Sequence, residues 1–282
     1  MTTFARHFFP QATDCALLEG KGKRGPDGGL KESELMTIVV MYHGSRFRDF
    51  KTFYGAYVLG LWRWAFPKAP CYERFITLQG RVLVPLTMFL CSRMGQKTGI
   101  YYVDSTSLPV CHNKRISRHK VFAGLAARGK TSMGWFFGFK LHIVFNHLRE
   151  IVAIKMTRGN VSDASVLPEL SRDLTGKIFG DKGYIGKKLS EELLRHGLTL
   201  MTRVRKNMKV LPMTLLDKML LNGRNIAETI IGNIKGFSSL NLPRHRSVTN
   251  AFVHTIAALT NYQLNPLTPK SQNPCLLNLI NP

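Results

Sequence analysis

Three acidic residues, Asp104, Asp181 and Glu228, are the side chains of this sequence best suited to chemistry. The chain has 17 acidic residues against 40 Lys and Arg, so the position of each carboxylate is informative. Asp104 lies inside "YYVDSTS", an aromatic and β-branched stretch that predicts a strand. Turn formation cannot explain an acid there. Because an unpaired buried charge is too costly, this carboxylate must be paired, metal-bound or solvent-facing.

Asp181 follows a short apolar run in "KIFGDKGYIGKK" and is flanked by Gly180 and by Lys182. It has two interpretations. A strand-to-helix turn with a capping aspartate is the favoured one when the residue is taken alone. If its strand is a neighbour of the strand that carries Asp104, however, the two carboxylates would meet at one side of a sheet.

Glu228 lies in "GRNIAETIIGNIKGF", which predicts a helix. At 100° per residue, Arg224, Glu228 and Lys235 fall within about 40° of one another. The opposite, core-facing stripe consists of Ile226, Ile230 and Ile234. Arg224 and Glu228 could also be a plain surface ion pair, worth a few tenths of a kcal/mol.

Three carboxylates brought together repel one another unless they are protonated or bridged by cations. Two Mg²⁺ ions, roughly 3.5 to 4 Å apart, relieve this repulsion in enzymes that cut phosphodiesters, and Mn²⁺ can substitute. One ion activates the attacking oxygen and the other stabilises the leaving oxygen. The ordered set of acids therefore predicts metal-dependent phosphodiester chemistry.

The elements that must position these acids are predicted from periodicity and turn residues. Residues 1–95 form an all-helical region, with a loop at 20–30, and the pattern then changes. Strands are expected at 100–108, 135–146, 150–159, 177–181 and 198–205. Helices are expected at 163–174, 187–197 and about 215–236. This order predicts an α/β domain at 96–265 with a mixed five-stranded sheet, followed by a tail at 266–282.

The charge of the chain is a formal +23, carried along its whole length. Such an excess indicates a polyanionic partner, nucleic acid first and an anionic membrane second. The five cysteines form no CxxC pair, which fits a reducing cytosol. No apolar run of 18 residues is apparent, so we expect a cytoplasmic protein without a membrane partner.

Two further segments have competing interpretations. The basic stretch 111–130, with Arg118 and Lys120, could follow a DNA backbone or be a solvated connection. Its Cys111, His112 and His119 have a spacing that fits no common zinc site. The stretch "RFRDFKTFYGAYVLGLWRW", residues 46–64, could read DNA ends, although most of its aromatic residues are expected in a core.

The local sequences also resemble those of a known family. "YYVDSTSLPVCHNKRISRHKVFAGLAARGKTSMGWFFGFKLHIV", "GDKGYIG" and "RNIAETIIGNIKGFSSLNLPRHRS" resemble the DDE transposases of bacterial insertion sequences, in particular the insertion sequence 982 family. The Arg224-x3-Glu228-x6-Lys235 spacing matches the signature around the last acid of many such enzymes. Leu221 stands where that signature often has a tyrosine.

The resemblance implies a ribonuclease H-like catalytic domain, as in retroviral integrases, preceded by a helical region. It implies that Asp104, Asp181 and Glu228 hold two metal ions, cleave the ends of an element and join its 3′-OH to target DNA. Arg224 and Lys235 would contact phosphates. Lys182, Arg118 and Lys120 are further candidates for contacting DNA. The partners would be double-stranded DNA, as inverted-repeat ends and target, and further copies of the chain in a homo-oligomer. A nuclease without strand transfer and an inactive DNA-binding relic are the alternatives.

Overall fold

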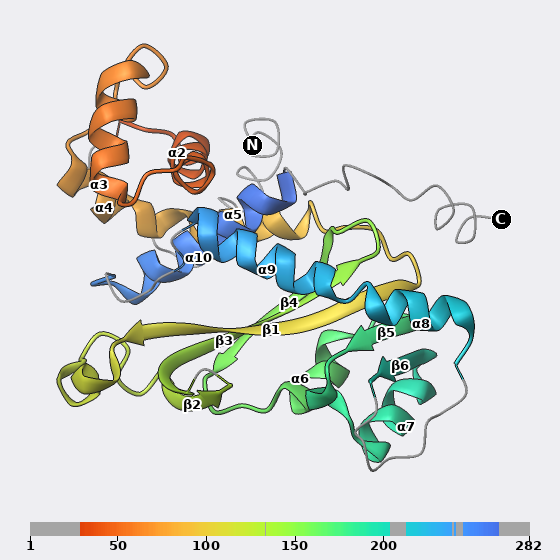
Figure 1. Ribbon diagram of the computed structural model, residues 1–282. Coiled ribbons are helices and arrows are strands. Elements are labelled where there is room, and N and C mark those ends of the chain that lie inside the picture. The colour runs from red at the N-terminus through yellow and green to blue at the C-terminus, as the bar shows by residue number, and fades with distance from the viewer. Residues whose placement is uncertain (1–28, 133, 204–212, 239, 241–244, 265–282) are drawn as a thin grey trace, which may run out of the picture.

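Six strands form one mixed sheet in the part of the chain that the structure describes (Figure 1). This computed structural model describes residues 29–132, 134–203, 213–238, 240 and 245–264. Most of the loop expected at 20–30 and the whole tail expected at 266–282 lie outside the described residues.

The sheet is built around one long central strand. Its members are β1 (Ile100–Cys111), β2 (Ala127–Thr131), β3 (Gly134–Asn146), β4 (Ile151–Arg158), β5 (Gly176–Gly180) and β6 (Leu198–Thr202). The strands β1, β3 and β4 are antiparallel neighbours, and β3 and β4 form the expected hairpin. The strands β5 and β6 return parallel to β1 through helices.

The prediction of five strands is wrong, because residues 127–131 of the basic stretch form the sixth strand, β2. This strand has the sequence ARGKT, which shows no hydrophobic alternation. It forms because it pairs antiparallel with the start of β3, from Ala127 opposite Gly138 to Thr131 opposite Gly134. Tertiary pairing with an aromatic-rich strand therefore overrides its local preference.

The prediction of one closing helix at 215–236 is also wrong. The segment forms α8 (Leu215–Asn222) and α9 (Asn225–Ser238), separated at Gly223 and Arg224. A further helix, α10 (Val248–Leu264), was not predicted. It is uncharged and is buried on most sides, so it lacks the polar face that reveals a surface helix.

The two faces of the sheet are covered by different helices. The helices α8, α9 and α10 pack on one face with Tyr102 and Phe179. The helices α6 (Asp163–Leu170) and α7 (Lys187–Arg195) pack on the other face with Tyr101, Val103 and Ile178. Consecutive residues of β1 thus point to opposite faces, as the pleat requires.

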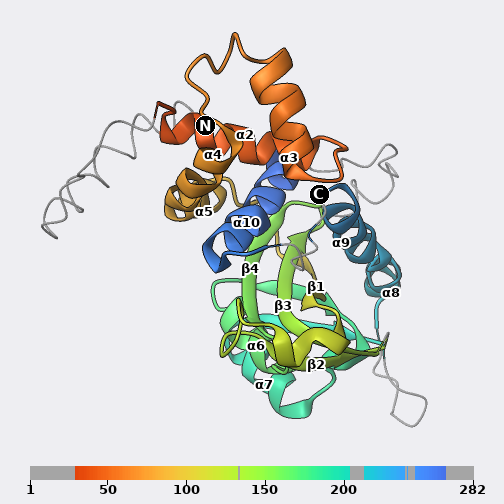
Figure 2. The same ribbon diagram turned by 90° about the vertical axis from the view of Figure 1, so that its left-hand side faces the viewer.

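A separate helical layer precedes the sheet, and aromatic residues fill its core. It contains α2 (Glu32–Gly44), α3 (Phe50–Phe53), the π-helix Tyr54–Leu61, α4 (Tyr72–Gln79) and α5 (Leu83–Cys91). Phe50, Phe53 and Tyr54 are buried as expected, whereas Trp64 is 82% exposed. Figure 2 shows α10 between this layer and the sheet, and α10 contributes Val253 and Ala257 to the aromatic core.

The helical run Tyr72–Cys91 is long and apolar enough to cross a membrane, by length and composition alone. The sequence prediction missed it because Pro85 and the polar residues of α4 interrupt the apolar run. Phe75, Leu78 and Leu86 of this run pack into the core of the helical layer. That packing is typical of a core helix, and a core helix can be as long and as apolar as a helix that crosses a membrane.

Candidate active site

Asp104 lies in the middle of the central strand, on the face covered by α9. It is opposite Ile143 of β3, and its Oδ1 accepts a 2.8 Å hydrogen bond from the backbone N–H of Ser105. Burial raises the pKa of Asp104 to about 6, and the charges of Glu228 and Asp181 also raise it, although the Ser105 hydrogen bond and Arg224 act in the opposite direction. The protein therefore holds a carboxylate where its negative charge is poorly solvated.

Asp181 comes directly after β5, the strand next to β1, and lies beside Asp104 on the same face of the sheet. The parallel register places Tyr102 opposite Phe179, so two residues further along Asp104 is opposite Asp181 on the same face. The Asp181 side chain makes no capping hydrogen bond to the 3₁₀ turn Lys182–Tyr184. The hydrogen bond to this turn is made by the backbone oxygen of Asp181, which accepts from the backbone N–H of Tyr184. The carboxylate is therefore available for other contacts.

Arg224 connects the third carboxylate to the sheet. Its Nη2 lies 2.7 Å from Glu228 Oε1, and its Nη1 lies 3.6 Å from Asp181 Oδ1. The Arg224 side chain is only 15% exposed. The pair of Arg224 and Glu228 is thus not a plain surface ion pair within one helix. The same guanidinium also joins the start of α9 to the end of β5.

Lys235 lies further along α9 and is half-buried. Burial lowers its pKa, while the charge of Asp104 acts to raise it, which places the ammonium group in the electrostatic range of that carboxylate. The rotation of α9 agrees with the helical periodicity, since Ile230 and Ile234 are buried against the sheet. The structure therefore brings Asp104, Asp181 and Glu228 together with Arg224 and Lys235.

The other candidate cations have different positions. Lys182 is exposed and follows Asp181 directly, at the edge of the carboxylate group. Arg118 and Lys120 are exposed in the segment after β1. At about 3.3 Å per strand residue, the end of β1 at Cys111 lies about 23 Å from Asp104. The structure does not bring Arg118 and Lys120 to the carboxylates.

The donor set fits a hard divalent cation, because three carboxylates supply only oxygen ligands and leave negative charge uncompensated at Asp104. Among the described residues, no three acidic, histidine or cysteine side chains converge closely enough to hold one ion. The Arg224 guanidinium lies between two of the three acids, Asp181 and Glu228.

Tyr184, which the sequence analysis did not select, lies behind the carboxylates. It is 3% exposed, and its ring lies against Gly180 and supports the end of β5. Its buried hydroxyl has no hydrogen-bond partner among the described residues. Burial raises its pKa, and the charges of Asp163, Asp104 and Asp181 raise it further. Its place in "GDKGYIG", three residues after Asp181, was the available signal.

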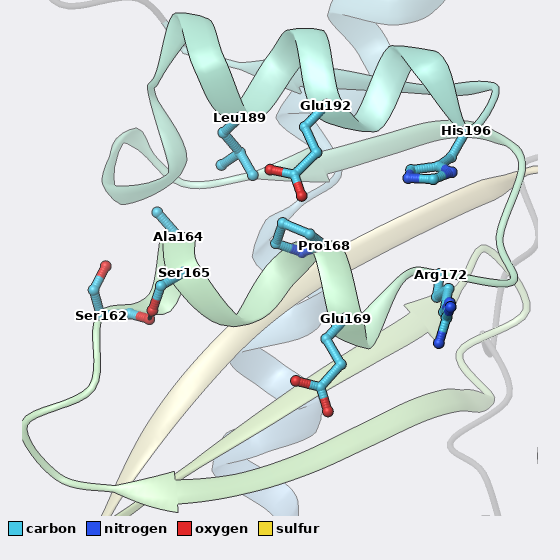
Figure 3. A pocket seen from close by; sticks show the side chains of 9 residues that line it. All are labelled: Ser162, Ala164, Ser165, Pro168, Glu169, Arg172, Leu189, Glu192 and His196. Carbon is cyan, nitrogen blue, oxygen red and sulfur yellow. Dashed lines mark hydrogen bonds between the residues drawn. The ribbon is translucent and has the colours of Figure 1, made fainter.

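A second concave region lies on the opposite face of the sheet, between α6 and α7 (Figure 3). Glu169 and Glu192 line it together with Arg172 and His196. Its lining mixes acidic and basic side chains, with Glu169 paired to Lys155, and it lies on the face of the sheet opposite to Asp104. The carboxylate group beneath α9 is therefore the better candidate for the active site.

The three acids also lie within a match to a known family. The profile of the family described as "Transposase DDE domain" matches residues 94–248, which is more than half of the chain. The chain belongs to this family. Members of the DDE transposase family generally use divalent metals, which agrees with the donor set. The catalytic acids of this transposase are therefore to be sought between residues 94 and 248.

Among solved structures, the chain is similar to a piggyBac transposase in a synaptic complex with hairpin DNA, determined by cryo-EM. The identity is 11% and the TM-score 0.40, with 94% of this chain and 80% of that chain covered. No curated protein matches the sequence.

Proposed function

We propose that this protein is a DNA transposase that cleaves phosphodiester bonds at the ends of an insertion sequence and joins the 3′-OH to target DNA. The observation that carries the proposal is that Asp104 lies within electrostatic range of Asp181 and Glu228 on one face of the sheet, within the family match. The local resemblance to the insertion sequence 982 family supports a bacterial insertion sequence as the source of its substrate.

The proposal extends to the fold. Leaving β2 aside, the sheet order is β4-β3-β1-β5-β6, with three antiparallel strands followed by two that run parallel to β1. This order supports a ribonuclease H-like assignment. In that assignment the first acid lies on the central strand, the second follows the fourth core strand, and the third lies on a later helix.

Asp104, Asp181 and Glu228 are the residues that would hold two Mg²⁺ ions, or Mn²⁺ in their place. When bound, such ions supply an activated attacking oxygen and stabilise the leaving oxygen. The chain's own contribution is positional. The Ser105 N–H orients the Asp104 carboxylate, and Arg224 holds Glu228 near Asp181.

Double-stranded DNA is the proposed partner, as element ends and as target. The formal charge of +23 favours a polyanion. Arg224, Lys235 and Lys182 lie beside the carboxylates, where they can contact phosphates next to the bond that is cut. We also propose that the protein acts as a homo-oligomer on DNA in the bacterial cytoplasm.

The test uses a plasmid that carries the coding region together with its flanking DNA. Asp104→Asn, Asp181→Asn and Glu228→Gln should each abolish Mg²⁺-dependent cleavage and leave DNA binding largely intact. Glu192→Gln on α7 is the matched control and should cleave normally. Retained cleavage in any one of the three variants removes that residue from the site.

The products separate the alternatives. Joined element and target strands support a transposase, whereas cleaved but unjoined products support a nuclease without strand transfer. Binding with no cleavage by the unmodified protein, in Mg²⁺ or Mn²⁺, supports an inactive relic.

A further inference from the structure

The segment 111–135, here called the arm, is the most uniformly basic part of the sheet domain. From Ser105 to Arg149 the chain contains no acidic residue. The exposed cations of the arm are Lys114, Arg115, Arg118, Lys120, Arg128 and Lys130. No ion pair therefore neutralises this surface from within the segment.

The arm is held in place and is not a loose connection. Asn113 Nδ2 donates a 2.7 Å hydrogen bond to the backbone oxygen of Trp135, and Arg158 Nη2 donates one of 2.9 Å to the backbone oxygen of Gly124. Phe122, which is part of the arm, is fully buried, and its ring stacks with that of His119. The cations therefore project from a fixed frame, which lowers the entropic cost of ordering them on a ligand.

An exposed tryptophan lies among these cations. The side chain of Trp135 is 62% exposed at the start of β3, and Lys130 Nζ lies 5.8 Å from the centroid of its ring. The contact with Lys130 is a cation–π interaction, and it keeps this large aromatic surface exposed beside positive charge. This surface is suited to DNA, where phosphates pair with the cations and a base or sugar covers the ring.

The position of the arm relates it to the carboxylates. β5 pairs only with Ile100 to Tyr102, so from Asp104 to Cys111 β1 has no neighbour on that side among the described strands. This unpaired part of β1 leads from the acids to the arm (Figure 1). The distance of about 23 Å along the strand corresponds to about seven base pairs of duplex.

The charge distribution selects the side on which DNA approaches. The layer of α6 and α7 mixes both signs of charge, because Glu169 pairs with Lys155 and Glu191 pairs with Lys187, whereas the arm carries cations alone. A duplex that contacts the carboxylates is therefore attracted along the β1 edge toward the arm.

We propose that the arm is a second DNA-contacting surface, which holds phosphates about seven base pairs from the bond that is cut and places Trp135 against the DNA. This inference rests on the proposed function. It assigns a role to the inserted strand β2 and to Trp135 that the catalytic site does not require.

The charge test compares two variants with the same change in net charge. One is Arg115→Gln/Arg118→Gln/Lys120→Gln in the arm, and the other is Lys187→Gln/Lys188→Gln/Arg195→Gln on α7. Binding to a labelled 40-base-pair duplex of arbitrary sequence is measured over a range of salt. The arm variant should lose about 2 to 3 units of the slope of log K against log salt, at about 0.9 for each phosphate, and the α7 variant should keep the slope.

Equal slopes in the two variants would overturn the role of the arm. Failure of the unmodified protein to bind the duplex at all would instead contradict the proposed function. Melting curves of both variants verify that they are folded.

The tryptophan test uses DNA-induced fluorescence quenching. The chain has three tryptophans, and Trp64, which is 82% exposed in the helical layer, provides the matched control. Trp135→Phe should lose most of the quenching that saturates with DNA binding, while Trp64→Phe should retain it. If DNA quenches the fluorescence of Trp135→Phe as much as that of the unmodified protein, Trp135 does not contact the DNA.

Discussion

At the scale of single residues, Asp104 and Arg224 define the site. Asp104 is held in a poorly solvated position on the central strand, and its pKa is raised to about 6. Arg224 supplies the positive charge that keeps Asp181 and Glu228 near each other. The group thus pairs one guanidinium with two acids and leaves a third acid poorly solvated. It suits a function that requires a cation and does not maximise stability.

Asp104→Asn should therefore stabilise the metal-free fold at neutral pH. The pKa is raised from 3.8 to about 6, so the folded state binds more protons between these values and loses stability as the pH rises through them. The difference between these two pKa values corresponds to roughly 3 kcal/mol. Thermal unfolding with a chelator should show a higher Tm for Asp104→Asn at pH 7.5, with little gain at pH 4.

The control for this measurement is Asp173→Asn. Asp173 is exposed and remote from the carboxylates, so its replacement should leave the Tm unchanged at both pH values. A lower Tm for Asp104→Asn at pH 7.5 would mean that the carboxylate is well stabilised in the folded protein.

At the scale of elements, α9 determines whether Glu228 faces the two aspartates. Ile230 and Ile234 pack against the sheet, and Lys235 lies near Asp104. The two sides of this helix thus have different roles, one in the core and the other in the site. Variants on each side should fail in different ways.

Ile230→Asp should destabilise the fold by several kcal/mol, because Ile230 is 1% exposed and the new carboxylate would be buried without a partner. Lys235→Ala should change the free energy of unfolding little, but should weaken binding to cleavage-site DNA and reduce the salt slope by about one phosphate's contribution. Urea unfolding and salt titrations measure these effects. The reverse pattern would show that α9 is turned the other way.

At the scale of the whole molecule, α10 joins the helical layer to the sheet. Val253 and Ala257 belong to the aromatic core, whereas Ala258, Leu259 and Tyr262 belong to the core beneath the sheet. His43 Nε2 and His254 Nδ1 lie 2.9 Å apart at the same boundary. The two parts therefore share one helix and stabilise each other.

A fragment that begins at residue 96 should consequently lose cooperative folding. It would expose the side of α10 that carries Val253 and Ala257, and the apolar area left in water opposes folding. Circular dichroism melting of the fragment should be broad or start below that of the full chain. A sharp transition at the Tm of the full chain would contradict the shared core.

The histidines at this boundary predict a pH dependence of stability. Burial lowers the pKa of His254 well below its ordinary value, with His43 and His245 acting in the same direction, and burial lowers the pKa of His245 to about 4. The unfolded chain takes up these protons near pH 6.5, so stability should be lost as the pH falls from about 6.5 toward 4. Urea unfolding at pH 7.5 and 5 should show the loss, and His254→Phe should reduce it.

The sequence by itself determined the features that depend on local periodicity. The 3.6-residue repeat of Ile226, Ile230 and Ile234 defined the buried side of α9, and the β-branched run around Asp104 predicted its strand. Only the tertiary structure decided the pairing of β2, the break between α8 and α9, and the burial of α10. In β2 and α10, contacts distant in sequence override or replace the local pattern, whereas the break between α8 and α9 lies at Gly223. The bridging position of Arg224 also depends on contacts distant in sequence, because Asp181 and Arg224 meet only when α9 packs on the sheet.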